Sequence, residues 1–300
     1  MSRPVVAGVD GSPESLAAAE WAAREAVRRD VPLHLVHASD WSPTQAPSAA
    51  ASMVRRHVGR GVLRKAEDRI ARTCPEARLT DEQVDGPAAE ALSHAAQQAE
   101  LLVLGSRGLS GFTGFLVGSV AQAVVARATR PVVLVEAGER SEDEHLPDED
   151  GNTSLLTPYR DVVLGIDVSD PCDEVIEFAF ESARLRGATL HAVQAWDNAS
   201  AVALGSGAPG IGEGPRREEE WRTFLTAVLQ NWRDKYPGVE VTETVVKGRA
   251  ATHLVRAASG AGLLVVGRRV RETHLGRHTG PVTHTVIHHA RCPVAVVAHD

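Results

Sequence analysis

A glycine-rich stretch in the first half of the chain has the residue types that hold a phosphate group. Gly105-Ser106-Arg107-Gly108 follows an apolar run, and Gly118-Ser119-Val120 begins a helical pattern nine residues further on. A glycine at a strand end lets the backbone turn and leaves no Cβ between it and a ligand. The N–H groups at a helix start favour an anion, and Arg107 and the Ser119 hydroxyl can add hydrogen bonds. The stretch predicts a phosphate site, with plain turns and helix capping as the alternative.

The strength of these contacts favours a phosphate over a neutral ligand. A helix dipole alone contributes about 0.3–1 kcal/mol, whereas each hydrogen bond to a charged group adds about 1.5–3 kcal/mol. Two or three such bonds, together with some burial of an adenine ring, account for micromolar binding.

A carboxylate ends the first apolar run of the chain. Val9-Asp10-Gly11-Ser12-Pro13 leads from a strand into a helix, with Ser12 as the expected N-cap and Pro13 as the first helical residue. Asp10 is therefore expected at the carboxyl end of a strand, where ligands bind in open α/β sheets. Its carboxylate can accept a hydrogen bond from a ribose hydroxyl or from an adenine amino group. A turn or capping role is the alternative.

The chain contains an internal duplication. Residues 5–10 recur as 162–167, and residues 33–38 recur as 190–195, both with an offset of 157. Residues 101–105 recur as 263–267 with an offset of 162, so the second copy has extra residues, which we assign to the Gly-rich stretch 205–214. A repeat of this length is a duplicated domain rather than a solenoid unit.

Within each copy, short β-branched runs alternate with helical patterns, which predicts βαβ units and a parallel sheet. The strand candidates of the first copy are 4–9, 32–38, 79–84, 101–104 and 131–135. The sequence therefore predicts an α/β fold of two tandem doubly wound domains, each with a five-stranded, mostly parallel sheet flanked by helices. We place the domains at 1–137 and 158–300. The acidic segment 138–157 between them is expected to be a solvated linker.

The motif Gly105-x2-Gly108-x9-Gly118-Ser119, with Asp10 after the first strand and Ala38 after the second, resembles the universal stress protein family. It is most similar to the ATP-binding branch in its tandem-domain form, and the resemblance covers all but the linker. It implies a Rossmann-like fold of the adenine nucleotide alpha hydrolase type, with ATP between the first and fourth strands. Asp10 and Ala38 would line the adenosine. The residues around ribose and phosphates would be Gly105, Arg107, Gly108, Gly118, Ser119 and Val120. Mg²⁺ or Mn²⁺ would accompany the nucleotide, although no protein ligand for it is evident.

The second copy departs from this motif. Asp167, Gly267 and Gly280 stand where Asp10, Gly105 and Gly118 stand in the first copy, and they are its candidate site residues. However, Val270 replaces a glycine, and Pro281 replaces the serine, which removes a hydroxyl and an N–H donor. We therefore expect the second domain to bind nucleotide weakly or not at all. His284 and His288 lie one helical turn apart, but no third ligand is apparent and no metal site is predicted.

Bulk properties disfavour several classes of function. A formal net charge of −7 argues against a nucleic-acid partner. No apolar run approaches the roughly 20 residues that cross a bilayer, and the first residues do not form a signal peptide, so we expect no membrane partner and a cytoplasmic location. The three cysteines include no CxxC pair, which excludes a zinc ribbon and disfavours a disulfide framework.

The leading hypothesis is an ATP-binding protein with a nucleotide-dependent regulatory or stress-response role. No catalytic residue is assigned, because the chain has no GxxxxGK[ST] loop and no evident base beside the glycines. A slow ATPase, and a dimerisation module with vestigial nucleotide sites, are the alternatives. A dinucleotide enzyme would need GxGxxG after the first strand, which this chain lacks. The resemblance also implies dimerisation through the last strand, either by internal pairing of 131–135 with 293–297 or as a homodimer.

Overall fold

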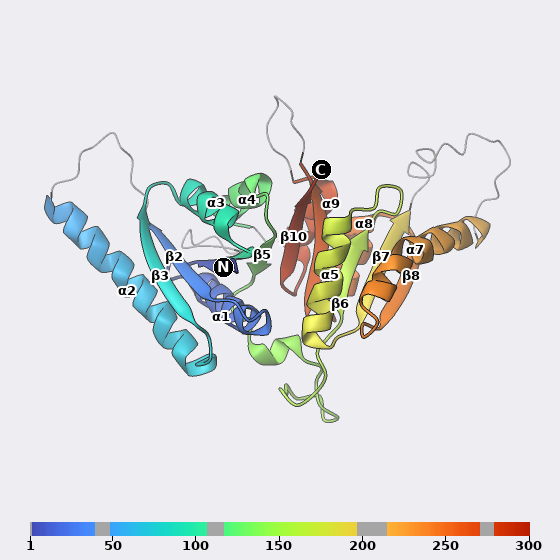
Figure 1. The fold of residues 1–300 in the computed structure, drawn as a ribbon, viewed down its shortest axis with the longest axis horizontal. Coiled ribbons are helices and arrows are strands. Elements are labelled where there is room, and N and C mark those ends of the chain that lie inside the picture. The colour runs from blue at the N-terminus through green and yellow to red at the C-terminus, as the bar shows by residue number, and fades with distance from the viewer. Residues whose placement is uncertain (1, 40–48, 107–116, 197–214, 271–278) are drawn as a thin grey trace. The chain divides into compact units, whose positions relative to one another are not determined.

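The computed structural model describes residues 2–39, 49–106, 117–196, 215–270 and 279–300 (Figure 1). They form two compact units, one with the residues up to Ser141 together with Thr279, and the other with Glu142–Val270 and Gly280–Asp300. We call these units the first and second domains and describe each by itself. None of the helices in the described ranges is long and apolar enough to cross a membrane.

The described part of the first domain is a parallel sheet covered by helices on both faces (Figure 1). Its strands are β1 (Val5–Gly8), β2 (Leu33–Ser39), β3 (Leu79–Asp85), β4 (Leu101–Gly105) and β5 (Val132–Val135). They lie in the order β3-β2-β1-β4-β5, and every neighbouring pair is parallel. The helices are α1 (Pro13–Arg28), α2 (Ala49–Thr73), α3 (Ala88–Gln98) and α4 (Ser119–Arg127). The α1–α2 pair covers one face and the α3–α4 pair the other.

The centre of this sheet is apolar on both faces, as the unbroken apolar runs predict. Val5 on β1 lies opposite Leu101 on β4, and both are fully buried. The α1 helix packs against these two strands. Its inner side is rich in alanine around the buried Trp21, which lets the helix approach the sheet closely.

The described part of the second domain repeats this architecture, which confirms the predicted fold. Its elements are β6 (Val162–Ile166), α5 (Asp173–Arg186), β7 (Leu190–Trp196), α7 (Pro215–Lys235), β8 (Val241–Lys247), α8 (Ala250–Ala258), β9 (Leu263–Arg269), α9 (Pro281–His289) and β10 (Val294–His299). The strand order is β8-β7-β6-β9-β10, again all parallel. As in the first domain, one helix pair covers each face, α5 with α7 and α8 with α9.

The acidic segment after the first domain differs from a fully solvated linker. A short 3₁₀ helix, η1 (Ser141–Glu144), leads into an antiparallel bridge between His145 and Tyr159. The backbone N–H of Arg160 donates to the carbonyl of Glu144 at 2.8 Å, and Glu144 is 1% exposed. Sequence composition indicated only charge here, whereas these backbone bonds fix the start of the segment to the second domain.

Candidate functional site

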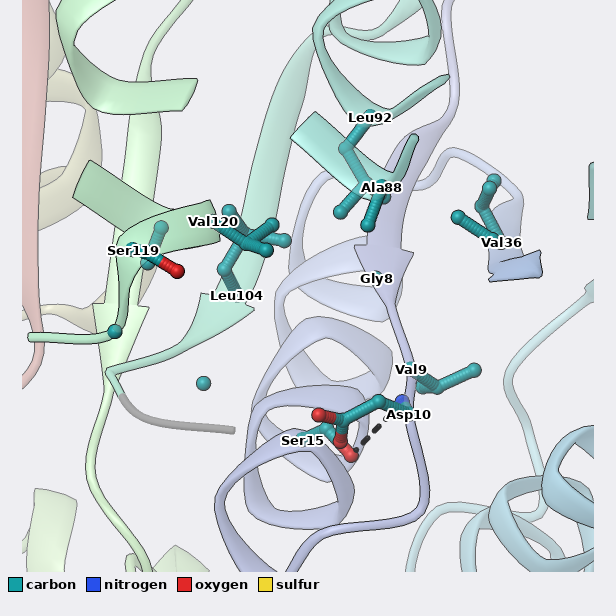
Figure 2. A pocket seen from close by; sticks show the side chains of 14 residues that line it. Gly8, Val9, Asp10, Ser15, Val36, Ala88, Leu92, Leu104, Ser119 and Val120 are labelled. Atoms are coloured by element: carbon teal, nitrogen blue, oxygen red, sulfur yellow. Dashed lines mark hydrogen bonds between the residues drawn. The ribbon is translucent and has the colours of Figure 1, made fainter. Parts of the chain in front are cut away.

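A cleft opens in the first domain at the carboxyl ends of β1 and β4 (Figure 2). Strand order reverses between these two strands, which is the point where open α/β sheets bind ligands. The cleft has about 730 Å³ of empty space, counting the part open to solvent. Its lining residues are Gly8, Val9, Asp10, Ser15, Val36, Ala38, Ala88, Leu92, Leu104, Gly105, Gly118, Ser119, Val120 and Ala121.

The walls of the cleft divide into an apolar part and a polar part. Figure 2 shows Ala88 and Leu92 entering from α3, and Val36 from β2. Asp10 lies at the end of β1, and Ser119 lies across the cleft at the start of α4. Such a site can bury a flat apolar ring and still offer hydrogen-bond partners at two separate places.

The loop after β1 is ordered by two serines. Ser12 is the N-cap of α1, and its hydroxyl accepts from the N–H of Ser15 at 3.1 Å, with Pro13 as the first helical residue, as predicted. The N–H and the hydroxyl of Ser12 both donate to Oδ1 of Asp10, at 2.9 and 2.6 Å. The Ser15 hydroxyl accepts from the N–H groups of Asp10 and Gly11, both at 3.2 Å. Gly11 has a φ of +85°, which favours glycine.

The lack of a side chain at Gly105 makes room for a neighbouring helix, whereas the sequence suggests that it makes room for a ligand. A Cβ on this residue would lie 2.8 Å from the carbonyl carbon of Glu14 and 2.8 Å from the nitrogen of Ser15. Both atoms belong to the first turn of α1, so the missing side chain makes room for the helix rather than for a ligand. Gly8 is equally tight, because a Cβ there would lie 2.6 Å from Cδ2 of Leu104.

The start of α4 has the features of an anion site. Gly118 is the N-cap, and its N–H donates to the carbonyl of Ser106 at 2.8 Å. Ser119 is therefore the first helical residue rather than the cap, and its side chain is exposed. The N–H groups of Ser119 and Val120 have no acceptor within the helix. The described residues outside it provide none either, so the two groups are available to an anion.

The cleft brings most of the predicted residues of the first domain together. They are Asp10, Ala38, Gly105, Gly118, Ser119 and Val120. Arg107 and Gly108 lie outside the described residues. Sequence reasoning missed the other lining residues, which are Gly8, Val9, Ser15, Val36, Ala88, Leu92, Leu104 and Ala121. For Val36 a signal was present, because residues two apart on a strand share a face and Val36 is two residues before Ala38.

The corresponding edge of the second domain is built differently. Strands β9 and β10 continue through Arg269 and His299, which lie opposite each other. A Cβ on Gly267 would lie 2.9 Å from Nε2 of His299, so that ring covers the residue corresponding to Gly105. Arg269 also forms an ion pair with Asp170 in the loop after β6. The ion pair joins the chain segments that leave β6 and β9, across the reversal point of this sheet.

The helix after β6 also begins later than its counterpart. The N-cap of α5 is Cys172, which corresponds to Ser15, a residue inside the first turn of α1. Val168 stands in place of Gly11, and a β-branched residue disfavours the positive φ of that glycine. The Cys172 thiol donates to Glu174 at 2.9 Å, and burial and this carboxylate raise the pKa of the thiol to about 11.

The residues at the start of α9 differ as well. Its N-cap, Gly280, has a φ of +76°, whereas Gly118 has a φ of −63°. The hydroxyl of Thr283 donates to the carbonyl of Gly267 at 2.8 Å.

Arg268, which corresponds to Ser106, is 4% exposed. The side chain of Val266 lies near the Cβ position of Gly165, whereas the Cβ position of Gly267 faces the other side of the sheet, near Val175. Arg268 therefore faces the same side as Val266, which α8 and α9 cover.

Comparison with known proteins identifies the family of the chain. The model of the universal stress protein family matches residues 1–136 and again residues 158–298. A universal stress protein of Mycobacterium tuberculosis strain H37Rv is 33% identical over 310 residues, covering 99% of both chains. A second one from that strain is 31% identical over 300 residues, covering 97% of this chain and 95% of the relative. The crystal structure of a universal stress protein from Archaeoglobus fulgidus, 17% identical, shares the fold over 100% of both chains with a TM-score of 0.69. The chain belongs to the universal stress protein family and contains two copies of its domain in tandem.

Proposed function

We propose that the first domain binds ATP and that nucleotide occupancy serves a regulatory or stress-response role. One observation carries the proposal: Asp10 and the start of α4 face the same cleft at the reversal point between β1 and β4. An acceptor on one side and N–H donors on the other fit a molecule with a hydroxyl or amino group at one end and phosphates at the other.

The apolar walls suit the base of the nucleotide. Val36 and Ala38 from β2, with Leu92 from α3, offer a surface of aliphatic side chains to a flat ring. Apolar burial contributes about 25 cal/mol per Å². Hydrogen bonds from the α4 amides to phosphate oxygens each add about 1.5–3 kcal/mol. Together these contributions support micromolar affinity.

Regulation fits the composition of the cleft better than efficient catalysis does. Among the described lining residues, Asp10 alone has an ionisable side chain. Hydrolysis of a phosphate ester at a useful rate needs a positioned base or an oriented water, together with cations that stabilise the developing charge. Slow ATP hydrolysis is the enzymatic alternative. A regulatory role requires that ATP bind two conformations of the protein with different affinities.

A divalent cation would be held mainly by the nucleotide. The described residues contain no group of three or more acidic, histidine or cysteine side chains that would hold a metal ion. Mg²⁺ prefers one or two carboxylates together with substrate phosphates and water, and Asp10 is the one carboxylate among the described lining residues. The chain thus offers no protein cage for the ion in the part that the structure describes.

Binding of ATP by the second domain is proposed to be weak or absent. The Arg269–Asp170 ion pair and the ring of His299 occupy the strand ends at which the first domain has its cleft. Asp167 is retained but exposed, whereas Asp10 is half-buried. A hydrogen bond from a nucleotide to an exposed carboxylate contributes less than one to a carboxylate that is shielded from water.

Calorimetric titration of the full chain with ATP tests the function, and the duplication supplies a matched control. We expect one ATP per chain. Asp10→Ala should lower the affinity about tenfold or more, because it removes a charge-assisted acceptor. Asp167→Ala, the same change in the second domain, should leave the affinity unchanged. Wild-type protein that binds no ATP would remove the proposal, and equal losses in the two variants would contradict its assignment to the first domain.

We also propose internal pairing of 131–135 with 293–297, with a homodimer as the alternative. Support comes from β5, whose residues Val132–Val135 are all apolar, whereas exposed edge strands usually have charged residues or proline that block further pairing. Light scattering distinguishes the mass of one chain from that of two. A cytoplasmic location is proposed as well, because Cys74, Cys172 and Cys292 form no disulfide, as is usual in reducing compartments.

A further inference from the structure

A loop in the segment that joins the two domains presents leucine side chains to solvent. We call residues 145–159 the leucine loop. Leu156 is 97% exposed, and Leu146 and Leu155 are also exposed. The hydroxyl of Thr157 donates to the carbonyl of Leu146, which keeps this leucine beside the stretch that contains the other two. Leucine is usually buried, and exposed apolar side chains that gather in one place mark an interaction surface.

The leucine loop is ordered by its own hydrogen bonds. Oδ1 of Asp148 accepts from the N–H groups of Asp150 and Asn152, at 3.0 and 2.7 Å. The N–H of Asp148 donates to the carbonyl of Asn152 at 2.9 Å. Beside the leucines, the N–H of Leu156 donates to the hydroxyl of Ser154 at 3.1 Å. An ordered loop loses little conformational freedom on binding, so more of the gain from burying the leucines is available for association.

The charge of the leucine loop restricts what it can bind. Residues 145–159 contain no lysine or arginine. Glu149 and Asp150 are exposed, and neither forms an ion pair among the residues that the structure describes. A partner surface should therefore combine apolar side chains with exposed cations, because juxtaposed like charges repel. An anionic membrane surface is disfavoured for the same reason.

One side of the helix α2 in the first domain has an exposed apolar surface. Met53, Val54 and Val58 are all exposed, Met53 to 68%. With 3.6 residues per turn, these three residues lie on one side of the helix. The opposite side, which includes the buried Leu63 and Ala66, packs against α1 and the strands β2 and β3. We call the side with Met53, Val54 and Val58 the apolar side of α2.

A row of arginines runs along the apolar side of α2. Arg56, Arg60 and Arg64 are spaced four residues apart, so they are neighbours on the helix surface. Arg60 forms an ion pair with Asp81 on β3. Arg56 and Arg64 are exposed, and in the described ranges neither takes part in an ion pair. This surface thus has both properties that a partner of the leucine loop needs.

We propose that the leucine loop of one copy of the chain docks on the apolar side of α2 in a second copy. Leu155 and Leu156 cover the exposed valines and methionine, while Glu149 and Asp150 face Arg56 and the rest of the arginine row. Every copy carries both surfaces, so two copies can exchange both contacts and close as a dimer. The inference goes beyond the proposed function and does not depend on ATP.

Light scattering of the full chain without nucleotide, over a series of concentrations, tests the contact. The wild type should reach the mass of two chains. Leu155→Ser combined with Leu156→Ser, called the loop variant, should raise the dissociation constant about tenfold or more, because it removes most of the apolar area. Val54→Ser combined with Val58→Ser, called the helix variant, should do the same. Phe224→Ser, which removes an exposed side chain on α7, is the control and should change nothing.

Mixing the loop variant with the helix variant tests which surfaces meet. Each variant keeps the surface that the other lacks, so the mixture should form a dimer with one contact although neither variant associates well alone. Leucine loops that paired with each other would instead leave the helix variant dimeric, which would overturn the inference. Far-UV circular dichroism should be unchanged in both variants, because the substituted side chains are exposed.

Charge reversal tests the same contact without removing apolar area. Glu149→Arg with Asp150→Arg, or Arg56→Glu with Arg64→Glu, should each weaken association about tenfold, because like charges then face each other. All four substitutions together should restore the wild-type dissociation constant to within a few-fold, as for directly interacting groups. Failure of the combined variant to associate would overturn the inference.

Two further results would also overturn the inference. One is a wild type that keeps the mass of a single chain at every concentration. The other is a dimer that survives in the loop variant and in the helix variant, because another surface then holds it. Association through the leucine loop is separate from pairing of β5 with β10, so the mass of the loop variant is the one that bears on that pairing. None of these results affects ATP binding by the first domain.

Discussion

The Cα of Gly105 lies so close to α1 that a Cβ there would stand 2.8 Å from the backbone nitrogen of Ser15. Ser15 in turn accepts hydrogen bonds from the N–H groups of Asp10 and Gly11. The end of β4 and the loop after β1 are thus joined through the first turn of one helix. Because residues of both segments line the cleft, packing at Gly105 also holds these lining residues in place relative to each other.

Gly105→Ala should therefore destabilise the protein even when no nucleotide is present. The new methyl group would overlap backbone atoms of Glu14 and Ser15, which cannot rotate away. We expect the free energy of unfolding to fall by about 1–3 kcal/mol, as for overpacked cores, measured by urea denaturation. Gly61→Ala is the control: nothing lies within 4 Å of its Cβ position on α2. That change should stabilise by about 0.5–1 kcal/mol. Equal stabilities of the two variants would contradict the steric explanation.

Gly11→Ala isolates the backbone requirement of the same loop. The φ of Gly11 is +85°, and the nearest atom to a Cβ there is a methyl carbon of Val62 at an ordinary 3.4 Å. The cost is therefore conformational rather than steric, about 1–2 kcal/mol. We expect a lower melting temperature and several-fold weaker binding of ATP, because the loop also positions Asp10. A variant with wild-type stability would show that the positive φ is not needed.

Local patterns predicted the parts of the site that depend on local chemistry. Ser12 followed by Pro13 indicated the start of α1, and the structure has the cap and the helix there. Asp10 and Ser119 are far apart in sequence, yet both follow from the doubly wound topology, because carboxyl ends of parallel strands meet at one edge. The apolar run of β4 likewise indicated a strand buried on both faces.

Contacts between distant residues could not be predicted in this way. The role of Gly105 depends on how closely α1 approaches β4, and no spacing in the sequence reports that distance. The ion pair of Arg269 with Asp170 joins the end of β9 to the loop after β6, and the sequence around either residue gives no sign of the other. The sequence does contain a signal for the late start of α5, because Val168 stands in place of Gly11. This signal can be interpreted only once the positive φ of Gly11 is known.

The thiol of Cys172 should react slowly although the residue is only half-buried. Burial and its hydrogen bond to Glu174 raise the pKa of the thiol from a usual 9.0 to about 11. At pH 8 the thiolate fraction is then about a hundredfold lower than for an ordinary thiol, and iodoacetamide reacts with the thiolate. The rate, followed by mass spectrometry of the Cys172 peptide, should rise with pH up to about 11. Because folding raises the pKa of the Cys172 thiol, the stability that the protonated thiol contributes to the folded state is fully present below pH 9. This contribution is lost as the pH rises through 11.

Glu174→Gln provides the comparison for this thiol. It replaces the carboxylate beside Cys172 with a neutral amide, so the thiolate is less disfavoured and the pKa should fall toward 9.0. Alkylation at pH 8 should therefore be faster than in the wild type. A rate that is unchanged by this substitution and independent of pH between 8 and 10 would show that access, not ionisation, limits the reaction.

Restoring the glycine motif of the second domain should not create a second ATP site. The double variant Val270→Gly and Pro281→Ser gives this domain the residue types of Gly108 and Ser119. It leaves unchanged the His299 ring over Gly267, the later start of α5 and the buried Arg268. These three features depend on packing and strand length, not on the two substituted residues. Calorimetry should therefore still give one ATP per chain, with the affinity of the first site unchanged. Two equivalents would show that the motif residues alone decide binding, and that the rearranged strand ends yield to the ligand.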